Sequence, residues 1–120
     1  MIKRFDRIDV ATTDLNDAAS IYEKNFGFKV TRARENASVT IGGAEIRLAS
    51  GASVADAIKA NGEGMFAIWL EADDLDQVVT SLKRAGIAAG AITEDGGRRV
   101  LAIDPKIANQ VPLFIFDRKG

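Results

Sequence analysis

An internal duplication is the feature that most constrains the fold of this 120-residue chain. Residues 8–14 (IDVATTD) correspond to residues 68–74 (IWLEADD), and in both segments a strand-like apolar pattern ends at an aspartate followed by leucine. The two aspartates, Asp14 and Asp74, stand 60 positions apart, which is half the chain length. A chain of this size buries roughly two thirds of the surface that it exposes when unfolded. We therefore expect two similar modules that share one core in a single domain, residues 1–120.

Hydrophobic periodicity predicts the order strand, helix, strand, strand, strand in the first half. Asp14 is the expected N-cap of the helix and Gly27 its expected C-terminal residue. Gly42-Gly43 predicts a hairpin turn between the last two strands. The expected strands span residues 3–12, 28–33, 37–41 and 45–49, and the helix spans residues 15–26.

The same order is predicted for the second half. Asp95-Gly96 indicates a hairpin, and the loop at 104–110 is longer than its counterpart at Gly42-Gly43, so that it could shape one end of a pocket. Ser53 is the expected cap of a short helical segment between the halves. The expected strands span residues 65–72, 87–93, 98–103 and 111–117, and the helices span residues 53–60 and 75–85. These limits predict module one at 1–52, a linker at 53–64 and module two at 65–120.

Composition excludes several classes of function. The net charge is −1, so the chain lacks the positive charge that proteins use to bind nucleic acid or an anionic membrane surface. It contains no cysteine and no histidine, which excludes disulfides, thiol or imidazole catalysis, and imidazole or thiolate metal ligands. The first residues enter a strand pattern without a signal-like apolar stretch, so we expect a cytoplasmic protein.

Two β-α-β-β-β modules define the predicted fold class, which is α+β. Each helix covers one face of its strands and leaves the other face bare. We expect the two modules to form a cup-shaped mixed sheet, with the residues that point away from the helices lining its concave face.

The order of elements, with the segments RIDVATTDLNDAASIYEKNFGF and IWLEADDLDQVVTSLKRAGI, resembles the vicinal oxygen chelate superfamily. This superfamily includes glyoxalases, extradiol dioxygenases, methylmalonyl-CoA epimerase, fosfomycin resistance enzymes and bleomycin resistance proteins. The resemblance covers almost the whole chain and implies the glyoxalase/bleomycin resistance fold. It also implies a homodimer, because small two-module members commonly pair.

The metalloenzymes of the superfamily take four ligands from the concave face. The resemblance places these positions at Arg7, Arg47, Ala67 and Phe114, none of which can ligate a metal. A shift of two residues along a strand offers carboxylates instead, at Asp9, Glu45 or Glu71. The resemblance therefore implies a pocket with no metal and no other cofactor, as in the bleomycin resistance branch.

Strand alternation predicts which side chains line the concave face. Trp69 and the two phenylalanines would supply apolar area for a ligand, and Arg7 or Arg47 would hold an anionic or carbonyl group. Alternatively, these arginines pair with neighbouring carboxylates and only neutralise the crevice. The predicted ligand-binding residues are Arg7, Asp9, Glu45, Arg47, Ala67, Trp69, Glu71, Phe114 and Phe116.

Other charged groups have simpler explanations. Asp73-Asp74 is interpreted as a helix cap instead of a metal site. The basic pairs Lys83-Arg84 and Arg98-Arg99 are interpreted as solvated side chains or partners of a helix C-terminus. No glycine pair has the strand-to-helix context of a phosphate-binding loop.

Three functions follow from these residues. The first is metal-free binding of a small, partly apolar organic molecule that can be anionic, as in antibiotic resistance proteins that sequester drugs. The second is an enzyme of the superfamily, with displaced metal ligands or with Asp9, Glu45 or Glu71 as general base. The third is an interaction protein whose concave face is filled by its own side chains.

Overall fold

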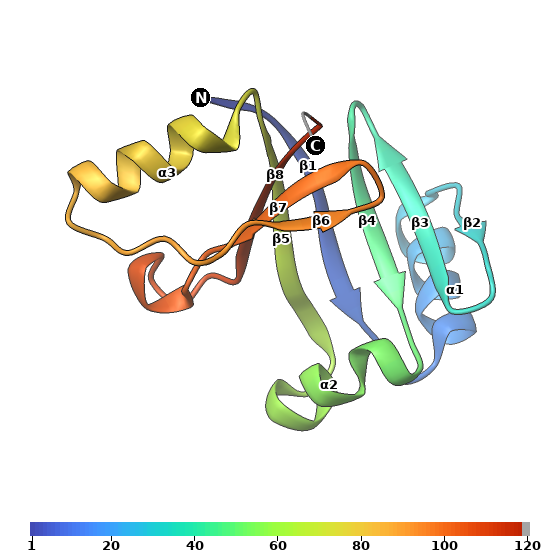
Figure 1. Ribbon diagram of the computed structural model, residues 1–120. Coiled ribbons are helices and arrows are strands. Elements are labelled where there is room, and N and C mark those ends of the chain that lie inside the picture. Colours follow the sequence, from blue (N-terminus) through green and yellow to red (C-terminus); the bar gives the residue numbers. More distant parts are fainter. Residues whose placement is uncertain (119–120) are drawn as a thin grey trace. The chain divides into compact units, whose positions relative to one another are not determined.

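The computed structural model describes residues 1–118 as a mixed α+β fold, as predicted (Figure 1). Each half contains one long helix and four strands. In chain order the elements are β1 (Ile2–Ala11), α1 (Leu15–Phe26), β2 (Thr31–Arg32), β3 (Asn36–Ile41), β4 (Ala44–Ala49), a 3₁₀ turn η1 (Ala52–Val54), α2 (Ala55–Asn61), β5 (Gly64–Ala72), α3 (Leu75–Arg84), β6 (Thr93–Asp95), β7 (Arg98–Ala102), a 3₁₀ turn η2 (Pro105–Ile107) and β8 (Leu113–Asp117).

Strand pairing confirms the duplication. The eight strands are hydrogen-bonded in the order β2-β3-β4-β1-β5-β8-β7-β6. β1 is parallel to β4 in the first half, and β5 is parallel to β8 in the second. The other pairs within each half, β2 with β3, β3 with β4, β6 with β7 and β7 with β8, are antiparallel. The two β-α-β-β-β modules therefore have the same internal topology.

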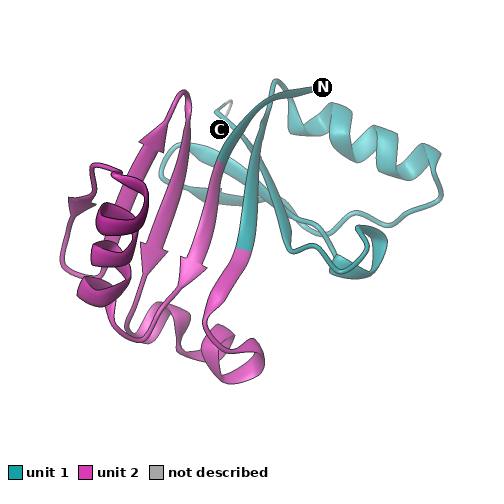
Figure 2. Ribbon diagram, turned by 180° about the vertical axis from the view of Figure 1, so that it is seen from behind, with its two compact units in different colours: residues 1–6, 67–120 teal, residues 7–66 magenta. Residues whose placement is uncertain are grey.

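The chain divides into two compact units, coloured separately in Figure 2. One unit contains residues 7–66, and the other contains residues 1–6 with the chain from Ala67 onward. The divisions fall inside β1 and inside β5, so each of these strands contributes to both units. The predicted single domain, with modules at 1–52 and 65–120, stays a prediction.

In the 7–66 unit, α1 packs on the sheet through small and branched side chains. Asp14 caps the helix by accepting a hydrogen bond from the Asp17 backbone N–H, as predicted. Gly27 ends it in the left-handed conformation, with φ of 69°. The buried core of this unit contains Ala19, Ala37 and Leu48. Complete burial of Leu48 contributes about 1.5–3 kcal/mol.

In the other unit, α3 packs on β7 and β8. Asp74 caps it through a hydrogen bond from the Asp76 backbone N–H, which confirms the capping interpretation. The core of this unit contains Ala72, Leu75, Val78, Leu101 and Ile115. Within residues 1–118, no helix has the length and apolar character needed to cross a membrane.

Arg99 corrects the interpretation of Arg98-Arg99 as solvated side chains. The Arg99 guanidinium donates to both carboxylate oxygens of Asp117, at 3.0 and 2.5 Å, and reaches Asp74 at 3.2 Å. Asp117 is fully buried and also accepts a hydrogen bond from the Leu75 backbone N–H at 2.7 Å. These carboxylates raise the pKa of Arg99 above its usual range. The network ties the start of α3 to β7 and β8.

Three local predictions were wrong. Of the strand expected at 28–33, only Thr31–Arg32 forms. Of the strand expected at 87–93, only its last residue belongs to a strand, β6 (Thr93–Asp95). The stretch AAGA at 88–91 has no large side chains to pack, and strands depend on such packing. Ser53 caps no helix, because neither η1 nor α2 has a side-chain cap hydrogen bond.

Candidate functional site

The predicted site residues fall in both compact units, and each set is considered within its own unit. Four belong to residues 7–66 and alternate in charge along β1 and β4. Arg7 lies opposite Glu45 and Asp9 lies opposite Arg47 in the parallel register. Along β1, Arg7 Nε donates to Asp9 Oδ1 at 2.8 Å. Along β4, Arg47 donates to both oxygens of Glu45, at 3.1 and 3.2 Å. The ion pairs of the alternative interpretation are therefore present.

These charges border a cavity of about 330 Å³ within the 7–66 unit. Arg7 and Asp9 form its buried floor, with 7% and 8% of their surface exposed. A polar rim and one aromatic ring surround them. The lining residues are Arg7, Asp9, Glu35, Asn36, Arg47, Ala49, Ser53, Val54 and Phe66.

Six of these lining residues were not predicted as site residues: Glu35, Asn36, Ala49, Ser53, Val54 and Phe66. Strand alternation contains a signal for two of them. Ala37 of β3 is buried in the α1 core, so Asn36 and its register partner Ala49 lie on the side that Arg47 shares. The other four come from the bend before β3, from η1 and from the start of β5, whose positions depend on tertiary structure.

The second set of predicted residues lies on β5 and β8 and is aromatic. Trp69 and Phe114 are register partners, and their rings stack with centroids 4.6 Å apart and planes 13° apart. Phe116 lies 6.2 Å from Trp69 at a steep angle. Phe116 is fully buried, whereas Trp69 and Phe114 are half-buried. Offset aromatic pairs of this kind give a flat, rigid apolar surface.

Two guanidinium groups cover this aromatic surface. Arg98 Cζ lies 5.4 Å from the Trp69 ring centre and 5.0 Å from that of Phe116. Arg118 Cζ lies 5.4 Å from the Phe116 ring centre. Neither arginine was predicted as a site residue. The alternation of β7 contains the signal for Arg98, because Val100 and Ala102 pair with Phe116 and Phe114 and Arg98 belongs to the same alternate set.

Glu71 and Ala67 complete the predicted set on β5. Glu71 is buried and is held by two arginines, Arg4 Nε at 2.9 Å and Arg118 Nε at 3.3 Å. Ala67 is also buried, with 1% of its surface exposed. This part of β5 therefore offers one neutralised carboxylate and one methyl group.

The donor chemistry does not fit a metal of the kind the superfamily's enzymes hold. The four positions that the resemblance assigns to metal ligands contain two guanidinium groups, a methyl group and a phenyl ring, at Arg7, Arg47, Ala67 and Phe114. The nearby carboxylates on the same strands, at Asp9, Glu45 and Glu71, each form an ion pair with an arginine. Within residues 1–118, no three His, Cys, Asp or Glu side chains gather closely enough to hold a metal ion.

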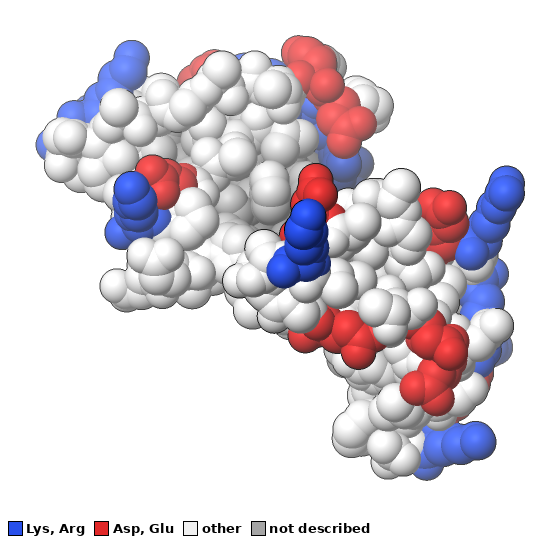
Figure 3. Space-filling view, turned by 90° about the horizontal axis from the view of Figure 1, so that it is seen from below, with Lys and Arg blue, Asp and Glu red and all other residues white. Residues whose placement is uncertain are grey.

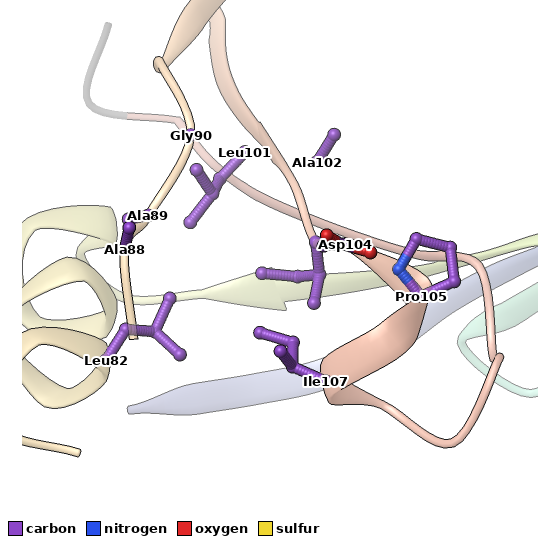
Figure 4. Close-up of a pocket in the computed structure, with 10 residues that line it drawn as sticks. Leu82, Ala88, Ala89, Gly90, Leu101, Ala102, Asp104, Pro105 and Ile107 are labelled. Carbon is purple, nitrogen blue, oxygen red and sulfur yellow. The ribbon is translucent and has the colours of Figure 1, made fainter. Parts of the chain in front are cut away.

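A larger cavity, of about 530 Å³, lies elsewhere in the unit that contains α3 (Figure 4). Leu82 of α3, the segment 88–90 and the end of β7 form its walls, and the loop at 104–110 contributes Asp104, Pro105 and Ile107. Leu82, Leu101 and Ile103 also belong to the core around α3, so the loop shapes an apolar cavity on the helix side. None of the predicted site residues lines it.

Figure 3 shows how charge is distributed over one face of the molecule. On the face seen in Figure 3, Lys and Arg side chains lie among Asp and Glu side chains. This distribution agrees with the net charge of −1.

Comparison with known proteins identifies the fold family. A model of the Glyoxalase/Bleomycin resistance protein/Dioxygenase superfamily matches residues 4–120. A search of curated proteins gave no match.

Several solved structures are similar in fold and distant in sequence. A variant of Streptomyces coelicolor methylmalonyl-CoA epimerase in complex with 2-nitronate-propionyl-CoA has a TM-score of 0.76 and 20% identity, with 100% of both chains covered. A hypothetical protein from Bacillus halodurans C-125 has a TM-score of 0.79 and 20% identity, with coverage of 98% and 95%. Methylmalonyl-CoA epimerase from Mycobacterium tuberculosis has a TM-score of 0.75 and 20% identity, with coverage of 97% and 88%. At this identity the likeness concerns the fold alone. Together with the match over residues 4–120, the strand order and duplicated modules lead to one conclusion: the chain belongs to the Glyoxalase/Bleomycin resistance protein/Dioxygenase superfamily.

Proposed function

We propose that this protein binds a small, partly apolar, anionic organic molecule without a metal, in the manner of the drug-binding resistance proteins of its superfamily. The observation that carries the proposal is the surface formed by the stacked, half-buried rings of Trp69 and Phe114. The Arg98 guanidinium lies over Trp69 and over the fully buried Phe116. Such a surface supplies stacking area and positive charge together, which suits a flat organic anion.

The chemistry at the ligand positions supports binding over metal-assisted catalysis. In this chain a phenyl ring, Phe114, stands at one of the positions that the metalloenzymes use, and it stacks on Trp69. Asp9, Glu45 and Glu71 are already hydrogen-bonded to guanidinium groups, so none of them is poised to take a proton from a substrate.

Binding can be measured through Trp69, which is the only tryptophan in the chain. We expect 2-naphthoate to change the intrinsic fluorescence in a saturable way and to give a matching dissociation constant by calorimetry. The Trp69→Leu substitution should weaken binding by roughly tenfold, because an aromatic pair is worth about 0.5–1.5 kcal/mol beyond its buried area.

Phe26→Leu is the matched control, since Phe26 is an exposed aromatic residue on α1 with 62% of its surface accessible. Its affinity for 2-naphthoate should equal that of the wild type. The proposal fails if a panel of aromatic acids that includes 2-naphthoate, together with bleomycin, gives neither fluorescence change nor heat.

The alternative is an enzyme, and the structural similarity to methylmalonyl-CoA epimerases favours it. The epimerisation of methylmalonyl-CoA requires removal of a proton from carbon, so it can be followed by deuterium incorporation in D₂O. Deuterium exchange that is faster than the uncatalysed rate, and that the Glu71→Gln substitution abolishes, would establish that the protein is an enzyme. Under the binding proposal, exchange stays at the uncatalysed rate.

A further inference from the structure

Two adjacent arginines on β7 differ sharply in how their side chains are used. Arg99 binds Asp117, Asp74 and Asp76 and belongs to the network at the start of α3. Arg98 points to the other side of the strand and forms one ion pair, from Nη2 to Asp95 Oδ2 at 3.1 Å. Among residues 1–118, Arg98 Nε and Nη1 donate to no protein acceptor. Arg98 therefore retains donors that a ligand can use.

The aromatic rings hold the Arg98 guanidinium in place. It lies over both Trp69 and Phe116, at 5.4 and 5.0 Å from the ring centres. The N–H groups of a guanidinium lie in its plane and point outward along its edges. The side chain retains 21% of its surface exposed, so solvent reaches it. A carboxylate can approach this edge and accept two parallel hydrogen bonds.

The β6–β7 hairpin fixes the base of this arginine. Asp95 and Arg98 are register partners on either side of Gly96-Gly97, whose φ values are 55° and 82°. Two successive positive φ values are typical of the tight turns that hairpin loops of two residues adopt. The Asp95 side chain is 66% exposed, so its bond to Arg98 is screened by water and contributes little. An incoming carboxylate can join or replace Asp95 at small cost.

The other arginines are less suitable as the anion-binding residue. Arg7 and Arg47 are each paired with a carboxylate two positions away on their own strand. Arg118 is 61% exposed and is paired with the buried Glu71. Arg98 lies over Trp69 and Phe116, and its ion pair is with the exposed Asp95.

We propose that Arg98 is the residue that recognises the anion, and that the ligand is a planar aromatic carboxylic acid. Its ring lies against Trp69 and its carboxylate accepts hydrogen bonds from Arg98. This inference rests on the proposed binding function and adds to it the class of ligand and the residue that selects it.

The experiment compares three probes of nearly the same shape: 2-naphthoate, its neutral amide 2-naphthamide, and the cation 2-naphthylmethylammonium. Each is titrated by calorimetry into the wild type, Arg98→Gln, Arg98→Lys and the surface control Lys83→Gln. Lys83 lies exposed in the last turn of α3, so its substitution removes the same charge away from the aromatic surface. Thermal unfolding checks that each variant is folded.

The wild type should bind the acid more tightly than the amide. Arg98→Gln should weaken binding of the acid by about 10- to 100-fold, the range expected when hydrogen bonds to a charged group are lost. Binding of the amide should weaken much less, because its carbonyl oxygen is an uncharged acceptor. Arg98→Lys keeps the charge but loses the planar fork, so its affinity should be intermediate. Lys83→Gln should behave as wild type.

The outcomes separate this inference from the proposed function. If Arg98→Gln binds the acid as tightly as wild type while Trp69→Leu does not, the choice of Arg98 is wrong and the binding function stands. If the wild type prefers the cation, the aromatic surface recognises positive charge and the ligand class is wrong. If the wild type binds none of the three probes, the ligand class is wrong, and the binding function fails as well only when the wider panel of aromatic acids and bleomycin also gives no signal.

Discussion

At the scale of single residues, Asp117 shows how a buried charge depends on its partners. It is fully buried, accepts the Leu75 N–H, and is bound by the Arg99 guanidinium through both carboxylate oxygens. We expect Asp117→Ala to lower the free energy of unfolding by about 3 kcal/mol, because the Leu75 N–H loses its buried acceptor and Arg99 keeps only its bonds to Asp74 and Asp76.

Urea denaturation at neutral pH measures this loss. Asp104→Ala is the control, since Asp104 is an exposed carboxylate that caps only the short η2 turn through the Lys106 N–H. If Asp117→Ala loses no more unfolding free energy than Asp104→Ala, the network has no importance for stability.

Glu63 gives the fold a pH dependence. Its Oε1 accepts hydrogen bonds from the Thr13 backbone N–H at 2.6 Å, the Thr13 hydroxyl at 2.7 Å and the Thr12 hydroxyl at 3.1 Å. These donors favour the charged carboxylate and lower the pKa of Glu63. Its contribution to stability is therefore full above the pKa of the unfolded chain and is lost as the pH falls through the lower pKa of the folded state.

Glu63→Gln keeps an acceptor oxygen but cannot titrate. Between about pH 5 and about pH 3, the variant should lose less unfolding free energy than the wild type. Glu94→Gln, on the exposed strand β6, should follow the wild type. Parallel pH profiles for wild type and Glu63→Gln would refute the assignment.

At the scale of elements, the sequence contains clear signals for both ends of α1. Asp14 begins the helix, and Gly27 ends it at a φ of 69°. A methyl group at Gly27 would meet no atom within 4 Å, so any cost of Gly27→Ala comes from the backbone conformation. We expect the substitution to lower the free energy of unfolding by about 1–2 kcal/mol.

Gly43→Ala is the matched control for this prediction. Gly43 also has open space around it, but it is not among the glycines with positive φ. Alanine there should be neutral or slightly stabilising, because it restricts the unfolded chain. Equal effects of the two substitutions in urea denaturation would contradict a conformational origin.

The two strands that were predicted wrongly are not determined by their own side chains. The stretch at 88–91 contains only alanine and glycine, so it could not be assigned from side-chain pattern alone. Thr31–Arg32 is the whole of β2, at one end of the strand order, and pairs only with β3. Short edge strands depend on their neighbours more than on their own sequence.

At the scale of the whole molecule, the absence of suitable metal donors leads to a stability prediction. Dialysis against a chelator should leave the unfolding temperature unchanged, and added Mn, Ni, Co or Zn should not raise it, because a ligand stabilises only when it binds the folded state. Elemental analysis of the purified protein should find no stoichiometric metal. A metal bound at one equivalent, with a rise in unfolding temperature, would support the enzyme instead.

The homodimer and the cytoplasmic location stay predictions. Light scattering coupled to size-exclusion chromatography would measure the oligomeric state directly.

The sequence by itself determined the duplication, the α+β class, the superfamily and the ends of α1. The α+β class and the ends of α1 depend on periodicity and on caps only a few residues away, so they are encoded locally, whereas the superfamily followed from the resemblance of two long segments. Only the tertiary structure decided which charges pair. Arg98 and Arg99 are neighbours in sequence with the same chemistry, but the strand sends them to opposite sides, one toward Trp69 and Phe116 and the other toward Asp117. Apart from Asp95, which pairs with Arg98 across the hairpin turn, these partners come from segments 18 or more residues away, and strand register determines which of them each side chain meets.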